Sequence, residues 1–354
     1  MACSRLRQRC DEQQTRSDTP MAAAANIHNT RHTTTGQRPR LTLVVPCYNE
    51  ALGLAAFFDR LTPVLAQLPG YAHEIICIDD GSTDDTYAQL EWHAQRNPHI
   101  TLVELSRNFG KENALTAGLD LADGDAVIPI DADLQHPPEL ILDMVKLWEQ
   151  GADMVLAKRK TRNDTGKLQR WLTQGFYRLH NQLAECHIPA DVGDFRLMDR
   201  QVVHSLQQLT ERTRFMKGLY AWVGYKQVTI EFDVEPRRHG QSSFNARKLF
   251  QLALDGIVGF STVPLYVWVG FGTVIAALAL LYGLWIVLST LLFGISVPGY
   301  ASILTAVLFL GGIQLIGIGV LGQYIGRTYK ETKKRPIYLV RRLHRHTLSE
   351  ITTP

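Results

Sequence analysis

The chain alternates short apolar runs with amphipathic segments between residues 41 and 157. Each apolar run is five or six residues long, which suits a buried strand. The runs are LTLVVP (41–46), EIICID (74–79), ITLVEL (100–105), AVIPI (126–130) and DMVLA (153–157). The first segment between them has a helical apolar face made of Leu54, Phe57, Phe58, Leu61, Leu65 and Leu68. Strands that alternate with helices predict an α/β fold on a parallel sheet with right-handed crossovers.

Helix-start signals support this alternation. Asn49 is the predicted N-cap of the first helix, and Ser82 with Asp85 has the spacing of a capping box for the second. Pro137 and Pro138 suit the first positions of a helix over residues 139–149.

Polar residues gather directly after four of the predicted strands. The clusters are PCYNE (46–50), DDGSTDDT (79–86), SRNFGKENA (106–114) and DADLQ (131–135). Because open α/β sheets bind ligands beyond the carboxyl ends of their strands, we expect all four clusters to line one cleft.

The DADLQ cluster predicts a metal site. Asp131 and Asp133 stand two residues apart after a strand, so their carboxylates point the same way and repel each other unless a cation lies between them. Mg²⁺ is commonly held by one or two carboxylates together with substrate phosphates, and Gln135 is a third candidate ligand.

The other clusters supply candidate substrate contacts. Asp79 and Asp80 close a strand, where a carboxylate can accept from a nucleobase imide or a ribose hydroxyl, whereas Asp84 and Asp85 suit a helix N-terminus. Arg107 and Lys111 could bind phosphate or organise the cleft, or could simply begin a solvated helix.

Two later motifs carry further charged groups. Asp194 and Arg196, in VGDFRLMDR (192–200), could contact or orient an acceptor substrate, or could form a plain hairpin ion pair. In PRRHGQSSF (236–244), Arg237, Arg238 and Ser242 suit an anionic group at a membrane surface, the alternative being a general attraction to lipid.

Residues 261–326 contain no Asp, Glu, Lys, Arg or His. The segment GISVPGY (294–300) divides them into spans 264–293 and 301–325, both long enough to cross a bilayer. The alternative is a pair of buried core helices. The basic segment 327–346 after the second span places both ends of the hairpin, and the N-terminal domain, in the cytosol. Residues 245–261 form an amphipathic stretch that suits the headgroup plane.

The remaining composition adds smaller constraints. Residues 1–38 are polar without apolar periodicity, which predicts disorder; they lack a signal-peptide core, and Met21 is an alternative start. The five cysteines have no metal-ligand spacing, as expected of reduced thiols in the cytosol. Because basic residues near the membrane account for the net charge of +3, we expect an anionic membrane surface as a partner and no nucleic acid.

Taken together and in order, these motifs resemble a membrane-anchored family 2 glycosyltransferase of the polyprenyl-phosphate group, and most of all the bactoprenol glucosyltransferases. The resemblance covers roughly residues 40–340. It implies a GT-A (Rossmann-like) domain in which Asp131 and Asp133 hold Mg²⁺ or Mn²⁺ and Asp194 lies by the reaction centre. Catalytic roles then fall to Asp194, Asp133 and Arg237, with Arg237 facing a diphosphate or the acceptor phosphate. The residues expected to border the nucleotide are Pro46, Tyr48, Glu50 and Asp79. The sequence departs from the group at Ser243, which replaces a frequent lysine and removes a cation from the phosphate-binding loop.

The resemblance also implies an activity and a location. The expected reaction is inverting transfer of a sugar, with glucose from UDP-glucose preferred, from a nucleoside diphosphate sugar to polyprenyl (undecaprenyl) monophosphate. Transferases that resemble dolichol-phosphate-mannose synthase or that use aminoarabinose or GlcNAc donors, a polymer-extruding synthase and a non-enzymatic nucleotide-sugar-binding scaffold are the alternatives. The expected place is the inner membrane, and Gly322 with Gly326 makes a GxxxG pattern compatible with a homo-oligomer. The predicted divisions are a disordered extension (1–38), a cytosolic GT-A domain (39–243), an interfacial helix (244–262), a transmembrane hairpin (263–326) and a basic cytosolic tail (327–354).

Overall fold

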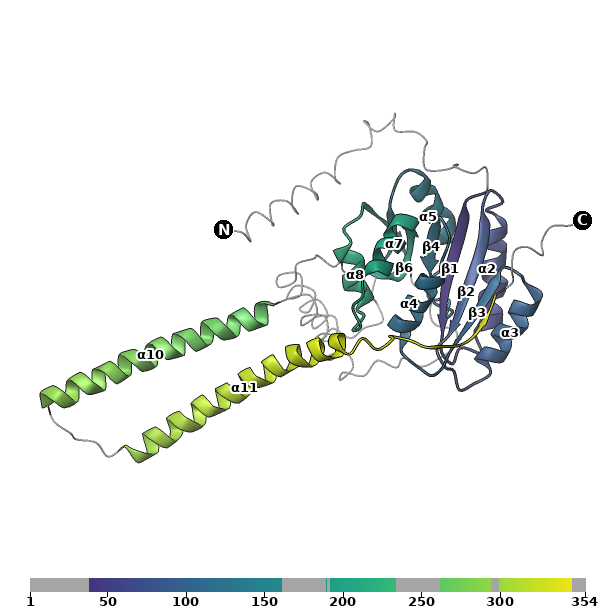
Figure 1. Cartoon of the computed structure of the whole chain (residues 1–354). Helices are drawn as coiled ribbons and strands as arrows, with labels where there is room; N and C mark the ends of the chain where they lie inside the picture. The colour runs from purple at the N-terminus through teal and green to yellow at the C-terminus, as the bar shows by residue number, and fades with distance from the viewer. Residues whose placement is uncertain (1–37, 161–188, 190–191, 234–261, 294–298, 346–354) are drawn as a thin grey trace, which may run out of the picture. The chain divides into compact units, whose positions relative to one another are not determined.

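The computed structural model describes residues 38–160, 189, 192–233, 262–293 and 299–345. An eight-stranded sheet in the order β7-β5-β6-β4-β1-β2-β3-β8 is the centre of the α/β domain (Figure 1). Its strands are β1 (Arg40–Cys47), β2 (Ala72–Asp79), β3 (Ile100–Leu105), β4 (Ala126–Pro129), β5 (Met154–Arg159), β6 (Val192–Asp199), β7 (Gln227–Phe232) and β8 (Val340–His344). The five strands predicted from apolar runs are therefore present, each within three residues of its expected bounds.

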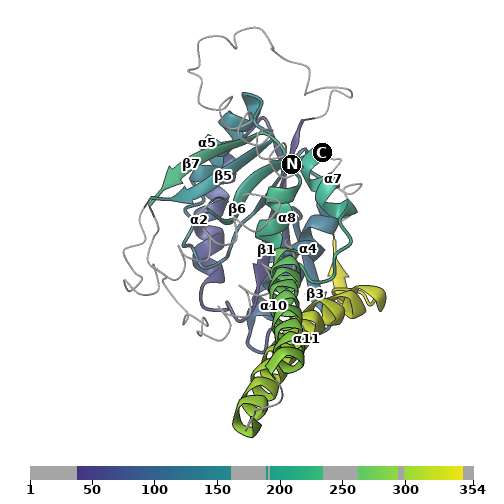
Figure 2. The same ribbon diagram turned by 90° about the vertical axis from the view of Figure 1, so that its left-hand side faces the viewer.

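The sheet is mixed, and the prediction of a parallel sheet was wrong for two of its strands. Strands β4, β1, β2 and β3 are parallel to one another, and β5 is parallel to β7. Strand β6 runs antiparallel to both β4 and β5, and β8 runs antiparallel to β3. Figure 2 shows β7, β5 and β6 side by side at one end of the sheet. Strand direction depends on the connection between strands, so the residues of β6 alone do not reveal it.

Helices cover both faces of the sheet and bury a separate apolar core on each. On one face lie α2 (Leu54–Ala66), α3 (Thr86–Arg96) and α5 (Leu140–Glu149). On the other lie α4 (Lys111–Leu121), α7 (Arg200–Gln208) and α8 (Met216–Trp222). The predicted apolar face of the first helix is confirmed, since Leu54, Phe57, Phe58, Leu61 and Leu65 are all buried. This three-layer arrangement is the α/β architecture expected from the alternation.

The predicted helix starts were only partly right. Helix α2 begins after Gly53, and Asn49 instead has a φ of 55° and accepts from the backbone N–H of Thr83. The Ser82 hydroxyl accepts from the Asn49 backbone N–H, so it links two loops and does not cap α3. Both predictions were wrong because a short polar side chain can form hydrogen bonds with a distant loop as readily as with the backbone of its own helix.

Two long apolar helices follow the α/β domain. Helix α10 spans Val263–Phe293 and α11 spans Tyr300–Thr332, as the two charge-free spans predict. Each contains a segment long and apolar enough to cross a membrane, Leu265–Ile286 in α10 and Phe309–Thr332 in α11. These segments are 0% and 6% buried in the structure, which disagrees with the alternative of buried core helices. The Trp268 indole lies directly against the backbone of Gly317, where a Cβ atom would stand 1.8 Å from Trp268 Nε1.

The segment predicted to be a basic tail contains a strand of the sheet. Strand β8 pairs with β3, and Arg341 and Arg342 both form ion pairs with Glu104. At the end of α11 the carboxylate of Glu331 accepts from the backbone N–H of Arg212 at 3.0 Å and of Thr213 at 3.3 Å. The chain after the second apolar helix is therefore fastened to the α/β domain and covers the edge of β3.

Candidate active site

The carboxyl ends of the central parallel strands bring the predicted polar clusters to one edge. In the register of β1 and β2, Cys47 stands opposite Asp79, and the Asp80 backbone N–H donates to the Cys47 carbonyl at 2.9 Å. Strand β4 ends beside β1, with the Ile130 N–H donating to the Val44 carbonyl at 2.9 Å. The expectation that these clusters share one edge is confirmed for β1, β2 and β4.

Asp79 and Asp80 have different surroundings at this edge. Burial raises the pKa of both carboxyl groups. Asp79 accepts from the Ser82 N–H at 3.2 Å, while the two oxygens of Asp80 accept from the N–H groups of Phe109 and Gly110 at 2.7 and 2.9 Å. Asp80 therefore fixes the loop that leads into α4.

Of the residues expected to border a nucleotide, Asp79 ends β2, and the other three lie at the end of β1 and in the loop after it. Pro46 is half-buried at the end of β1, and the Tyr48 side chain is 45% exposed. The Glu50 backbone N–H donates to the Thr86 hydroxyl at 2.9 Å, so this loop is fastened to the start of α3. Tyr48 directly follows Cys47, the sheet partner of the buried Asp79, so this edge offers an exposed aromatic ring for stacking and a carboxylate that can accept a hydrogen bond.

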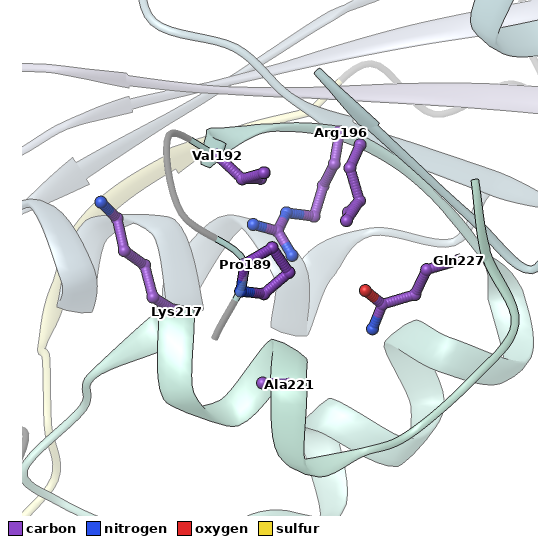
Figure 3. Close-up of a pocket in the computed structure, with 7 residues that line it drawn as sticks. Pro189, Val192, Arg196, Lys217, Ala221 and Gln227 are labelled. Carbon is purple, nitrogen blue, oxygen red and sulfur yellow. The ribbon is translucent and has the colours of Figure 1, made fainter. Parts of the chain in front are cut away.

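Asp194 and Arg196 project from β6 on the α4 and α8 side of the sheet. Arg196 is buried, donates from Nη2 to the Gly193 carbonyl at 2.7 Å, and lies 3.7 Å over the Tyr220 ring. It lines a small pocket with Leu156, Pro189, Val192, Lys217, Ala221 and Gln227 (Figure 3). The ion pair that Asp194 makes in the described structure is with Lys111, so the hairpin pair within β6 is not its arrangement here.

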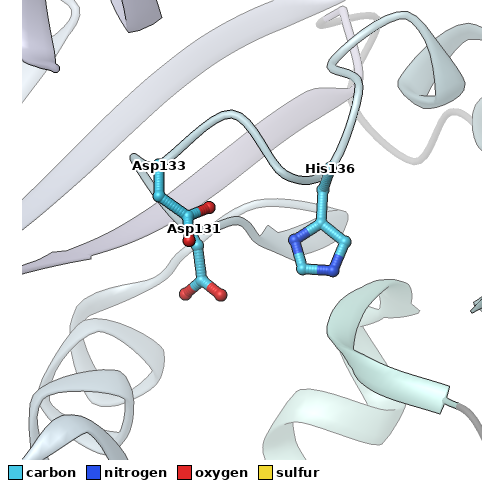
Figure 4. A group of neighbouring side chains, drawn as sticks. All are labelled: Asp131, Asp133 and His136. Atoms are coloured by element: carbon cyan, nitrogen blue, oxygen red, sulfur yellow. The ribbon is translucent and has the colours of Figure 1, made fainter. Parts of the chain in front are cut away.

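A group of possible metal ligands follows β4. Asp131, Asp133 and His136 each place a ligand atom within 4.8 Å of the others (Figure 4). The His136 ring is buried, with ring centroids 5.2 Å from Phe195 and 5.5 Å from Phe232, and its Nδ1 atom has no hydrogen-bond partner among the described residues. Burial lowers the pKa of His136, which favours the neutral, ligating form.

These donors suit a divalent cation. Carboxylate oxygens and a neutral imidazole nitrogen are ligands that Mn²⁺ accepts, and Mg²⁺ accepts the carboxylates. Sequence reasoning missed His136, although it stands three residues after Asp133 in the same run. The backbone N–H of Gln135 donates to Asp133 at 3.1 Å, and Gln135 as a metal ligand stays a prediction.

Lys111, the first residue of α4, connects the possible metal ligands after β4 with Asp194 on β6. Its Nζ atom lies 2.7 Å from Oδ1 and 2.8 Å from Oδ2 of Asp131, and 3.2 Å from Oδ2 of Asp194. Burial lowers the pKa of Lys111, but these two carboxylates outweigh it and raise the pKa, so the ammonium stays charged. The expectation that Lys111 lies near the edge is thus confirmed, whereas Arg107 is exposed and stacks 4.0 Å over the Phe109 ring.

Charges around Asp194 set its ionisation. Burial raises the pKa of Asp194, yet Lys111, Lys217 and Arg196 outweigh burial and lower the pKa to about 2. Glu112 responds in the opposite direction: burial and the charge of Asp194 raise its pKa to about 7. The Glu112 carboxylate accepts from the Met216 N–H at 3.0 Å and so holds the start of α8. Asp194 is therefore an anion at neutral pH.

Arg237, Arg238 and Ser242, residues 1–37 and residues 244–261 of the predicted interfacial helix lie outside the described residues.

Comparison with known proteins decides the family. Residues 42–206 match the family described as Glycosyl transferase family 2. An uncharacterized glycosyltransferase of Synechocystis sp. (strain ATCC 27184 / PCC 6803 / Kazusa) is 52% identical over 300 residues, which cover 85% of this chain and 94% of the relative. The chain belongs to glycosyl transferase family 2. It is a glycosyltransferase with a GT-A-like α/β fold, as the sequence motifs indicated.

Other relatives of this family 2 glycosyltransferase carry more specific names. The prophage bactoprenol glucosyl transferase homolog of Escherichia coli (strain K12) is 48% identical over 304 residues, covering 86% of this chain and 99% of the relative. The bactoprenol glucosyl transferase of Shigella phage SfV is 48% identical over 302 residues, covering 85% and 98%. Among solved structures, glucosyl-3-phosphoglycerate synthase from Mycobacterium tuberculosis, in complex with Mn²⁺, UDP and glucosyl-3-phosphoglycerate, matches with a TM-score of 0.42 and 21% identity, covering 62% of this chain and 78% of that one.

Proposed function

We propose that this glycosyltransferase transfers glucose from UDP-glucose to a polyprenyl monophosphate, undecaprenyl phosphate, at the cytosolic face of the inner membrane. The observation that carries the proposal is the 48% identity, over nearly the whole length of the relatives, to proteins named bactoprenol glucosyl transferase. The charged site at the carboxyl edge of the sheet is consistent with it, because it offers separate places for a nucleotide and for an acceptor.

The donor would bind on the β1, β2 and β4 side of the edge. Pro46, Tyr48, Glu50 and Asp79 would border the nucleotide, and Asp131 and Asp133 would hold a divalent cation, Mg²⁺ or Mn²⁺. Gln135 or His136 would supply the third protein ligand. When bound, the cation neutralises charge that develops on the departing diphosphate. Asp80 would act indirectly, since both its oxygens already hold the loop before α4.

The acceptor would approach from the Asp194 side. A phosphate oxygen of the lipid attacks the anomeric carbon, the bond from that carbon to the β-phosphate oxygen breaks, and UDP leaves with the electron pair. One direct displacement inverts the anomeric configuration. A phosphate monoester has a second pKa of about 6 and is mostly a dianion at neutral pH, so it needs no strong base. An anionic Asp194 would position the acceptor together with Lys111, whose Nζ atom lies 3.2 Å from it, and Lys217, whose charge helps to lower its pKa.

The two apolar helices would anchor the enzyme beside its lipid substrate. The charge-free spans and the basic residues after α11 favour an inner-membrane hairpin with the catalytic domain in the cytosol. Arg237, Arg238 and Ser242 would then bind phosphate near the membrane surface. A catalytic domain held at the membrane surface in this way would bring a soluble donor to an acceptor dissolved in the bilayer.

A donor screen tests the proposal. Purified protein in detergent is incubated with undecaprenyl phosphate and separately with UDP-glucose, GDP-mannose, UDP-N-acetylglucosamine or a UDP-aminoarabinose donor, and the lipid product is identified by mass spectrometry. We expect a hexose-phosphate lipid from UDP-glucose in the presence of Mg²⁺ or Mn²⁺, with β-linkage from the α-linked donor by NMR. A preference for another donor would overturn the glucose assignment, and products with free sugar acceptors alone would overturn the lipid acceptor.

A further inference from the structure

The carboxylate best placed to receive a metal is already occupied by a lysine. Both oxygens of Asp131 lie within 2.8 Å of the Lys111 ammonium, and the same ammonium lies 3.2 Å from Asp194. A divalent cation that binds Asp131 must therefore share that carboxylate with Lys111 or displace it.

We propose that Lys111 exchanges partners when the metal binds. Asp131 would then serve the cation, while Lys111 would keep Asp194 and turn its remaining N–H groups to a phosphate group of the bound substrates. The inference rests on the proposed function, and it makes Lys111 both a competitor of the metal in the free enzyme and a phosphate ligand in the loaded one.

Sharing is unfavourable on electrostatic grounds. An ammonium and a divalent cation on the same carboxylate repel each other at short distance, in a site where Asp131 is only 25% exposed. Asp194 offers Lys111 an alternative partner that remains ionised, since neighbouring ammonium and guanidinium groups stabilise its charge. The lysine thus loses one anion without being left unpaired.

The position of Lys111 allows the movement. It is the first residue of α4 and its side chain, although it packs between two carboxylates, is 48% exposed, so its four-carbon stem has room to rotate on the solvent side. A cation at a helix N-terminus opposes the helix dipole, so the stability of α4 gives no reason for a lysine here. The carboxylates of Asp131 and Asp194 do give one. The preceding residue also leaves room for the movement: Gly110 has a φ of 96°, and the space where its Cβ atom would stand is open.

The identity of the phosphate group follows from the location. Asp131 belongs to the donor half of the site and Asp194 to the acceptor half, and Lys111 spans them. A nucleoside diphosphate bound beside Asp131 would place its phosphates within the reach of Lys111. An ammonium binds phosphate as a mobile point charge, which suits such a transfer.

Metal affinity without nucleotide gives the first test. Free Mn²⁺ is measured by electron paramagnetic resonance during titration of wild-type protein, Lys111→Met and the control Lys217→Met. Lys217 lies near Asp194 and has no ion pair with Asp131 in the described structure, so it reports the general loss of one charge. We expect Lys111→Met to bind Mn²⁺ about threefold to tenfold more tightly than wild type, the size of effect of a partly buried ion pair, and Lys217→Met to change less. Unchanged or weaker Mn²⁺ binding by Lys111→Met would overturn the exchange.

Nucleotide affinity gives the second test. With Mn²⁺ saturating, UDP binding is measured by calorimetry, and Lys111→Met is expected to bind UDP about threefold to tenfold more weakly than wild type. Equal UDP affinity would overturn the phosphate role. Lys111→Gln serves as a second variant if Lys111→Met fails to fold, which circular dichroism and size-exclusion chromatography would reveal. If wild-type protein bound neither Mn²⁺ nor UDP, the proposed function itself would fail; if wild type bound both and the variants did not differ from it, only this inference would fail.

Discussion

Gly81 is the residue whose replacement should most clearly disturb how the site is assembled. It has a φ of 65°, and an added Cβ atom would stand 2.5 Å from the carbonyl carbon of Arg107 and 2.6 Å from the backbone nitrogen of Asn108. These are backbone atoms of the loop that Asp80 fixes and that leads to Lys111. Gly81→Ala must therefore move this loop or strain the turn after β2.

The cost can be worked out from two contributions. An alanine in the left-handed region costs about 1–2 kcal/mol, and a forced contact with a packed neighbour costs about 1–3 kcal/mol more. Gly151 provides a matched control, because it has a φ of 94° with nothing within 4 Å of an added Cβ atom. Gly151→Ala should bear only the first contribution. We expect the two variants to differ by about 2 kcal/mol in the free energy of unfolding, or roughly 4–8 °C in Tm for a domain of this size.

Thermal unfolding followed by tryptophan fluorescence, in one detergent and at one scan rate, measures this difference. UDP binding by the folded variants measures its effect on the site: Gly81→Ala should bind UDP more weakly, because Lys111 moves with the displaced loop, and Gly151→Ala should bind it as wild type does. The reasoning would be refuted by a Gly81→Ala variant as stable as Gly151→Ala with unchanged UDP affinity.

Three further predictions follow from other parts of the structure. Because the pKa of Glu112 is raised from 4.5 to about 7, its contribution to stability is complete below pH 4.5 and is lost as the pH rises to 7; the Tm of wild type should fall over that range more than the Tm of Glu112→Gln, and equal slopes would contradict the assignment. Asp133→Asn should weaken Mn²⁺ binding by about tenfold or more, while Asp143→Asn, at an exposed ion pair with Lys146, should not change it; in the same titration, Gln135→Ala and His136→Phe identify the third ligand as the variant that also loses affinity. Glu331→Gln should speed amide hydrogen exchange in the peptide containing Arg212 and Thr213, by about fivefold to tenfold if about 1–1.5 kcal/mol of hydrogen bonding is lost, whereas Lys330→Gln should leave it unchanged.

The elements that local sequence specifies were predictable. Apolar runs identified five strands, and the positions of Asp79, Asp131 and Asp133 at strand ends followed from the alternation, because parallel strands place their carboxyl ends at one edge. The two long apolar helices, α10 and α11, were likewise predictable, because the sequence between residues 261 and 326 contains no charged residue. These conclusions need no knowledge of which distant segments meet.

What depends on distant contacts was not predictable from one sequence. Strand β8 pairs with β3, which lies far before it in the sequence. Nothing in VRRLH (340–344) distinguishes a strand from a solvated basic tail. The bridge from Lys111 to Asp194 joins α4 to β6, and its existence depends on the antiparallel insertion of β6 beside β4. Asn49 and Ser82 have good capping residue types, but each is engaged by the neighbouring loop.

The most direct test of the account is metal-dependent transfer itself. Radiolabelled glucose from UDP-glucose is followed into undecaprenyl phosphate, with Mg²⁺, Mn²⁺ or EDTA, for wild type, Asp133→Asn and Asp194→Asn. The account predicts a labelled lipid from wild type that EDTA abolishes, loss of metal-dependent turnover in Asp133→Asn, and a reduced kcat in Asp194→Asn. Transfer that persists in EDTA and in Asp133→Asn would contradict it.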